Sequence, residues 1–272
     1  MKKQYCMMAA LFILTACSLT GCKNKEKEEL TGIHSTEETK ETMKETMAET
    51  TKAVKESTSA ETTSAGSSAS SALTVRSKIA TEKNGKVSIE YPILSNLRDE
   101  KTAETVNNLI KENALRIVTD NKLDPEKDNV TVECDIISLD RSKAVMTFRG
   151  SMKTDGSAYP VSLFYTMTID LSKGTLQGLS DYADPYTMAG YILSDDCIIT
   201  ETVDKGAAKE YLSGQNLDSL WQTLKKADFT SAEKDLFPES FSYVNNGVIY
   251  ISVPVSHALG DYILVEFHPE AK

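Results

Sequence analysis

Few residues of this 272-residue chain stand in patterns that support catalysis. Ser231 and Lys234 have the S-x-x-K spacing in which a lysine can activate a serine nucleophile, but the accompanying S-D-N and K-T-G segments are missing. Asp195 and Asp196 are adjacent, so their side chains diverge, and a solvated turn explains them better than a pair of cooperating carboxylates. G-x-S-x-G, G-x-G-x-x-G and P-loop motifs are also absent. We therefore expect no catalytic residue and a protein that is not an enzyme.

Metal-ligating residues are equally sparse. The chain has three histidines, of which His257 and His268 lie in its C-terminal part, and it has no H-E-x-x-H or C-x-x-C motif to bring zinc ligands together. The acidic stretch 124–128 is followed by Asn129 where a calcium loop needs glycine. We expect neither a metal nor another cofactor.

Cys134 and Cys197 are the two cysteines of the C-terminal part, and two interpretations of them stay open. Outside the cytoplasm they could form a disulfide with each other. Alternatively, they are buried free thiols that pack like small hydrophobic residues. The sequence does not decide between these two states.

Cys22 ends a segment with the features of a lipoprotein signal peptide. Lys2 and Lys3 precede an apolar run over residues 7–19, which is shorter than the roughly 20 residues of a membrane-spanning helix. The run leads into the sequence LTGC, which resembles the bacterial lipobox, where the cysteine thiol receives a diacylglycerol. We predict a signal peptide over residues 1–21 and a mature chain that begins at an acylated Cys22 and is anchored in the membrane by its acyl chains.

Residues 22–76 predict a disordered tether. Thr, Ser, Glu, Lys and Ala dominate the segment, and it contains no proline and no aromatic residue. Such a composition cannot bury enough apolar area to offset the conformational entropy of an ordered backbone. A random coil of this length would span roughly 40 Å, so we interpret it as a spacer between the membrane and a folded domain.

The charge of the chain excludes one class of partner. The chain has 30 Lys+Arg and 40 Asp+Glu residues and a formal net charge of -10. Residues 1–21 hold two lysines, and residues 22–76 hold eight basic and ten acidic residues, so the net charge of -10 falls on residues 77–272. An acidic surface does not neutralise phosphates, so we exclude nucleic acid as a partner. It suits solubility or a basic partner.

Residues 77–272 predict one α+β domain in which helices pack on an antiparallel sheet. Alternating apolar residues indicate the strands, a 3.6-residue apolar period indicates the helices, and Pro92 is expected to end the first strand. Asp184 and Asn216 are predicted helix caps, and Asn246-Gly247 a hairpin turn. Strands are expected over residues 86–91, 130–139, 143–153, 159–171, 175–179, 241–244, 248–253 and 262–268, and helices over 98–119, 185–193, 204–212 and 217–227.

Three stretches of this domain resemble a known family. Residues 89–93 (IEYPI), followed by a helix that carries VNNLI at 106–110, are similar to the opening of an extracytoplasmic domain of unknown function. RsiV-type anti-sigma factors and PdaC-type peptidoglycan deacetylases share that domain. Residues 176–182 and 248–260 are similar to its middle and closing parts. The resemblance implies a membrane-tethered α+β domain, and RsiV-type members bind lysozyme. This chain lacks the sigma-binding segment and the deacetylase motifs, so neither of those activities is implied here.

The sequence thus predicts a non-enzymatic binding module, anchored to the outer face of the cytoplasmic membrane of a Gram-positive-type bacterium. Its partner would be a cationic lysozyme-like protein or a cell-wall glycan. Tyr182 and Tyr186 are candidate ligand-binding residues, because tyrosine is common at such contacts. Ser256 and His257 are further candidates. Members of the family tend to carry an aromatic residue and a proline near these positions, so this chain departs from the family's pattern there, which weakens the inference of lysozyme binding. The alternatives are a wall-modifying hydrolase whose carboxylates no motif reveals, and an accessory subunit of an envelope complex.

Overall fold

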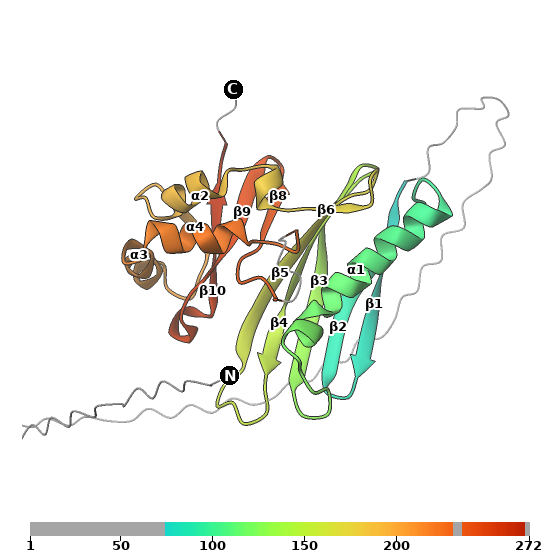
Figure 1. Cartoon of the computed structure of the whole chain (residues 1–272), viewed down its shortest axis with the longest axis horizontal. Helices are drawn as coiled ribbons and strands as arrows, with labels where there is room; N and C mark the ends of the chain where they lie inside the picture. Colours follow the sequence, from blue (N-terminus) through green and yellow to red (C-terminus); the bar gives the residue numbers. More distant parts are fainter. Residues whose placement is uncertain (1–73, 231–235, 270–272) are drawn as a thin grey trace, which may run out of the picture. The chain divides into compact units, whose positions relative to one another are not determined.

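The computed structural model describes residues 74–230 and 236–269, which form two β-sheets and four α-helices within these ranges (Figure 1). Cys22 and almost all of the tether lie outside the described residues, as do Ser231 and Lys234. The strands are β1 (Arg76–Asn84), β2 (Val87–Ser95), β3 (Asn129–Leu139), β4 (Lys143–Lys153), β5 (Val161–Asp170), β6 (Thr175–Gln177), β7 (Ile198–Glu201), β8 (Ser242–Asn245), β9 (Val248–Pro254) and β10 (Tyr262–Phe267). The helices are α1 (Glu100–Asp120), α2 (Pro185–Ile192), α3 (Lys205–Ser213) and α4 (Leu217–Lys225), with short 3-10 turns η1 (Leu179–Asp181) and η2 (His257–Leu259).

The first six strands form one sheet, sheet A, in the order β1-β2-β3-β4-β5-β6. Neighbouring strands are antiparallel except β2 and β3, which pair in parallel over residues 87–89 and 130–132. α1 connects these two strands, because a parallel pair needs a crossover. A two-residue turn joins β1 to β2, and its first residue is Gly85, whose φ of +53° favours glycine.

Pro92 lies inside β2, so the prediction that it ends the strand was wrong. The pairing of β2 with β3 stops at Ile89, so this edge of β2 has no strand partner further along. At Leu94 the side chain of Asn107 on α1 takes that place, accepting from the Leu94 N–H at 2.8 Å and donating to its carbonyl at 3.0 Å. A residue without a backbone N–H is therefore tolerated at position 92.

One face of sheet A is covered by α1. Asp99 caps the helix by accepting a hydrogen bond from the Thr102 N–H at 2.8 Å. Val106, Ile110 and Ile117 are buried, which confirms the predicted apolar stripe. The strand residues in this core include Ile89, Val132, Met146, Phe148, Tyr165 and Met167.

The last strands form a second sheet, sheet B, in the order β7-β10-β9-β8, which packs on the opposite face of sheet A. Val145 and Phe164 alternate along β4 and β5 with the residues that face α1, so they point the other way, where they contact Tyr243 and Leu264 of sheet B. The far face of sheet B is covered by α2, α3 and α4 (Figure 1). This second core includes Met188, Ile192, Leu212, Leu224, Ile251 and Val265.

An aromatic cluster extends the core between α1 and sheet A. The rings of Phe229, Phe237 and Phe241, from the segment after α4, lie around Tyr165 of β5 with centroids 5.5 to 6.1 Å from its ring. Because this segment follows the helices that cover sheet B, the cluster joins the two halves of the domain.

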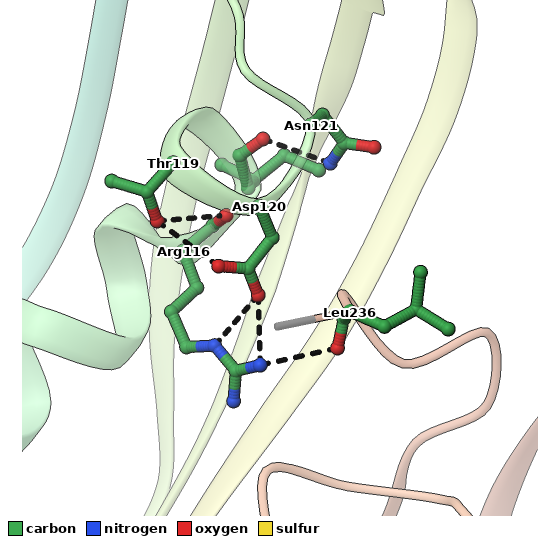
Figure 2. A network of polar contacts seen from close by, with 6 residues as sticks. Arg116, Thr119, Asp120, Asn121 and Leu236 are labelled. Atoms are coloured by element: carbon green, nitrogen blue, oxygen red, sulfur yellow. Dashed lines mark hydrogen bonds and ion pairs between the residues drawn. The ribbon is translucent and has the colours of Figure 1, made fainter. Parts of the chain in front are cut away.

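Polar contacts from the C-terminal end of α1 hold the segment between α4 and β8 in place (Figure 2). Arg116 forms an ion pair with Asp120 at 2.7 Å and donates to the carbonyl of Leu236 at 3.1 Å. The Arg116 guanidinium also lies 4.9 Å from the centre of the Phe229 ring. One arginine thus combines an ion pair, a backbone hydrogen bond and a cation–π contact.

The predicted α+β class, with antiparallel sheets and helices packed on them, is confirmed. The single expected sheet is two sheets, and the strands β1 and β7 were missed. β1 is outermost in sheet A and mostly exposed, so it has no apolar alternation, and β7 has only four residues. Within the described ranges, no helix has the length and apolar character needed to cross a membrane.

Tyr165 provides a test of the core. Its buried hydroxyl donates to the carbonyl of Ala114 at 2.9 Å, and burial raises the pKa of this phenol, so it stays a neutral donor. We expect Tyr165→Phe to lower the free energy of unfolding by about 1 kcal/mol, measured by urea denaturation. Tyr159→Phe, at a tyrosine that is 69% exposed, is the matched control. Equal stability of the two variants would contradict this role.

Candidate functional site

A hollow of about 300 Å³ opens where the start of β5 meets the end of β7 and the start of β10. It is the candidate site because both sheets and the loop that holds η2 contribute to it. We call it the charged cleft, and it includes the rim residues Tyr159, His257 and Asp261. Its lining residues are Ser162, Glu201, Thr202, Val203, Leu259, Gly260 and Tyr262.

Glu201 is held in the charged cleft by two donors. Arg149 Nη1 donates to Glu201 Oε1 at 2.6 Å, and the Tyr262 hydroxyl donates to the same oxygen at 2.9 Å. Arg149 Nη1 also donates to the Tyr262 hydroxyl oxygen at 3.0 Å, which closes a triangle. Phe164 supports this arrangement, because its ring centre lies 4.8 Å from Arg149 Cζ and 5.1 Å from that of Tyr262.

The electrostatics keep Tyr262 in its donor state. Burial, together with the hydrogen bond to Glu201 and its charge, raises the pKa of Tyr262 to about 12. The phenol is therefore neutral at physiological pH and continues to donate to the carboxylate. Since both donors bind Oε1, the Oε2 atom of Glu201 has no hydrogen-bond partner within residues 74–230 and 236–269.

His257 stands at the rim of the charged cleft. Its Nδ1 lies 2.9 Å from Asp261 Oδ1, and Asp261 Oδ2 accepts a hydrogen bond from the Ser162 N–H at 2.7 Å. The imidazole stacks on the exposed ring of Tyr159, with 5.9 Å between the ring centres. The turn before β10 brings the carboxylate into place, because Gly260 and Asp261 both have left-handed backbones, with φ of +97° and +72°.

The charged cleft has the composition of a recognition surface. Tyr159 is 69% exposed and Val203 is 77% exposed, so apolar side chains lie beside the carboxylates of Glu201 and Asp261. Solvent-facing aromatic and apolar groups next to fixed charges are typical of protein contact sites. The geometry can bind a ligand that carries both apolar and positively charged groups.

Two of the four predicted ligand-binding residues lie on the loop beside the cleft. His257 is at its rim, whereas the neighbouring Ser256 lines a separate hollow with Tyr211 and Thr223. Tyr186 on α2 is about half exposed and packs edge-to-face on Trp221, with 5.6 Å between ring centres. It lines neither hollow, so the structure does not bring it together with His257.

Tyr182 belongs to a buried polar network instead of a surface site. Its hydroxyl contacts the hydroxyl of Ser242, which donates to the carboxylate of Asp228 at 2.5 Å. Burial is the main cause that raises the pKa of Tyr182 far above its ordinary value. The polar end of Tyr182 thus supports the interior of the domain, and its role as a ligand contact stays a prediction.

Cys134 and Cys197 are free, buried thiols in the structure. Cys134 lies in the core between α1 and sheet A, and Cys197 lies in the core between sheet B and its helices. In the structure the two cysteines are therefore not joined by a disulfide, and both thiols pack like small hydrophobic residues. Burial raises the pKa of Cys134 to about 12 and that of Cys197 to about 11, so both stay protonated at neutral pH.

The described residues hold no group of three or more His, Cys, Asp or Glu side chains that could bind a metal ion. The structure also shows which site residues the sequence analysis missed. Arg149, Glu201 and Tyr262 come from three strands that are far apart in the chain, and of the residues of the charged cleft only His257 was predicted from the sequence.

Comparison with known proteins found likeness in structure alone. No family model matches the chain, and no curated protein matches it. One similar solved structure is a DUF3298 family protein from Pseudomonas aeruginosa PAO1, with 8% identity and a TM-score of 0.35 over 65% of this chain and 81% of that one. Another is a member of the same family from Bacteroides fragilis NCTC 9343, with 12% identity and a TM-score of 0.34 over 72% and 89%. The structural neighbours of this chain thus include members of DUF3298, a domain family of unknown function.

Proposed function

We propose that this protein is a lipid-anchored binding module on the outer face of the cytoplasmic membrane, and that the charged cleft is its recognition surface. The lipobox-like LTGC and the tether composition support the location. One observation carries the binding role, namely that Tyr159 and Val203 expose apolar surface beside the carboxylates of Glu201 and Asp261. The role is recognition, without turnover of the partner.

The chemistry of the charged cleft favours a cationic protein as the partner. Glu201 is oriented by Arg149 and Tyr262 before any ligand arrives, so little side-chain entropy is lost on binding. The net charge of -10 attracts a basic partner at long range, and the exposed aromatic ring supplies apolar contact at short range. A lysozyme-like protein has the charge for this site, in keeping with the resemblance to RsiV-type domains.

Lysozyme binding to the full-length chain tests this proposal. We expect binding that weakens as salt is raised from about 50 to 500 mM, because the Debye length falls from above 10 Å to a few ångströms. Tyr159→Ala and Glu201→Gln are each expected to weaken binding about tenfold at 150 mM salt, measured by isothermal titration calorimetry.

Two controls separate a built site from general charge attraction. Tyr186→Ala removes an exposed tyrosine outside the charged cleft, and Asp195→Asn removes an exposed charge outside it. Both variants should bind as the parent chain does. If all four variants bound equally, or if the parent chain did not bind at low salt, the charged cleft would not be a site for a cationic protein of this kind.

A further inference from the structure

A second hollow, of about 330 Å³, lies on the other side of the loop that carries His257. We call it the neutral hollow. The C-terminal end of α3, the connection to α4 and one side of α4 form one wall, and the end of β9 with the residues after it forms the other. Ser256 lines the neutral hollow and His257 stands at the charged cleft, so one loop borders both.

The neutral hollow contains no charged residue in its lining, although the chain has a net charge of -10. Five of its side chains can form hydrogen bonds, and all five are neutral: Tyr211, Gln215, Ser219, Thr223 and Ser256. Such side chains can form hydrogen bonds with a ligand that has neutral donors and acceptors. They provide no counter-charge for a phosphate, a carboxylate or an ammonium group.

Several of these polar groups are available to a ligand. Within residues 74–230 and 236–269, the hydroxyls of Tyr211 and Ser256 have no hydrogen-bond partner in the protein. The Gln215 amide makes one long hydrogen bond, 3.4 Å to the carbonyl of Tyr211. Free donors and acceptors in a hollow gain more from a polar ligand than groups that are already paired.

The remainder of the lining is apolar and is fixed by the core. Leu220 and Val253 are buried in the core between sheet B and its helices, and Pro254 and Val255 continue from the end of β9. Tyr211 packs against the same core, so its ring is held at the wall of the neutral hollow. Rigid apolar surface next to neutral hydroxyls matches a ligand with C–H faces and a rim of hydroxyl groups.

From this lining we infer that the neutral hollow is a binding site for an uncharged saccharide. Its volume lies at the lower end of the range of small-molecule pockets, about 300–1,000 Å³, which suits one or two sugar rings at a time. This inference is independent of the charged cleft. The charged cleft would bind a cationic protein on one side of the loop, and the neutral hollow would bind an uncharged saccharide on the other side.

The test uses the full-length chain in a polyoxyethylene detergent, because a detergent with a sugar headgroup would compete. The probes are triacetylchitotriose and maltotriose, two neutral oligosaccharides, observed by saturation-transfer difference NMR. We expect at least one of them to bind, with an affinity that changes little with salt because the ligand has no charge. Tyr211→Phe and Ser256→Ala should each weaken the binding by about two- to tenfold, which is the value of one neutral hydrogen bond.

Matched variants distinguish this site from the charged cleft. Tyr186→Phe removes a hydroxyl outside the neutral hollow and should leave saccharide binding unchanged, as should Glu201→Gln. If neither neutral probe bound, or if Tyr211→Phe and Ser256→Ala bound as the parent chain does, the inference would be wrong. Chitotriose, the cationic counterpart of the first probe, should bind more weakly here. Stronger, salt-sensitive binding that Glu201→Gln removes would assign the sugar to the charged cleft and overturn the inference.

Discussion

Asp228→Ala is expected to lower the free energy of unfolding by about 3–5 kcal/mol and the melting temperature by about 10 °C. Asp228 is only 3% exposed, and its carboxylate accepts three hydrogen bonds. These come from the backbone N–H of Leu179 at 2.8 Å, the backbone N–H of Ser242 at 2.7 Å and the hydroxyl of Ser242 at 2.5 Å. Alanine leaves these buried donors without an acceptor, and it also disfavours the left-handed backbone at this position, where φ is +64°.

The pH dependence of stability gives a second signature of the same carboxyl group. Burial raises the pKa of Asp228 to about 6 in the folded chain, although its hydrogen bonds act in the opposite direction. A raised pKa means that the folded state keeps the proton that the unfolded state releases above about pH 4. This contribution to stability is therefore present below pH 4 and is lost as the pH rises through 6, by on the order of 3 kcal/mol.

Asp228→Asn separates the charge from the backbone conformation, because asparagine also tolerates a left-handed φ. We expect this variant to be less stable than the parent at pH 7 and to lose the change in stability between pH 4 and 6. Denaturation by urea at several pH values measures both effects. Asp195→Asn, at an exposed aspartate, should change the free energy of unfolding by less than about 0.5 kcal/mol. A parent-like pH profile in Asp228→Asn would exclude Asp228 as the titrating group.

The second large effect concerns the membrane anchor. Cys22→Ala is expected to move the protein from the membrane fraction into the soluble extracellular fraction, because it removes the thiol that would carry the acyl chains. Each buried CH₂ contributes about 0.8 kcal/mol, so two acyl chains hold a protein firmly in a bilayer and their loss releases it. Cell fractionation measures the distribution, and mass spectrometry of the intact protein measures the added lipid.

Cys17→Ala is the matched control, because it changes another cysteine of the predicted signal peptide but leaves the lipobox-like LTGC intact. This variant should remain in the membrane fraction and keep the lipid mass on Cys22. If Cys22→Ala stayed with the membrane, or if the native chain carried no lipid, the predicted anchor would be wrong, and the proposed location would lose its support.

Capping and turn residues in the sequence predicted helix ends and hairpins, because these depend on contacts between residues that are close along the chain. Asp184 accepts from the Thr187 N–H at 2.8 Å and Asn216 from the Ser219 N–H at 3.1 Å, so both predicted caps are confirmed. The Asn246-Gly247 turn joins β8 to β9 as expected, since both residues adopt a positive φ. β1 escaped notice because an exposed edge strand has no apolar period, although Asn84-Gly85 between two polar-apolar runs was a usable hairpin signal.

The candidate sites depended on contacts that no local pattern encodes. Arg149 is separated by 52 positions from Glu201 and by 113 from Tyr262, and the three meet because sheet B packs on the back of sheet A. Asp228 likewise reaches Leu179 across 49 positions. Ser256 and His257 were singled out from the sequence, but adjacency along the chain did not show that they border two different hollows.

The amino-acid sequence by itself therefore determined the α+β class, most helices and hairpins and the acidic character of the domain, because these follow from composition, periodicity and capping within a few residues. The tertiary structure alone decided that the strands of the described ranges form two sheets, that the Tyr182 hydroxyl supports the interior, and that a charged and a neutral hollow share one loop. The physical reason is that side chains from distant strands come together only when the layers pack, and burial and packing then fix which of their polar groups face the protein and which face a ligand.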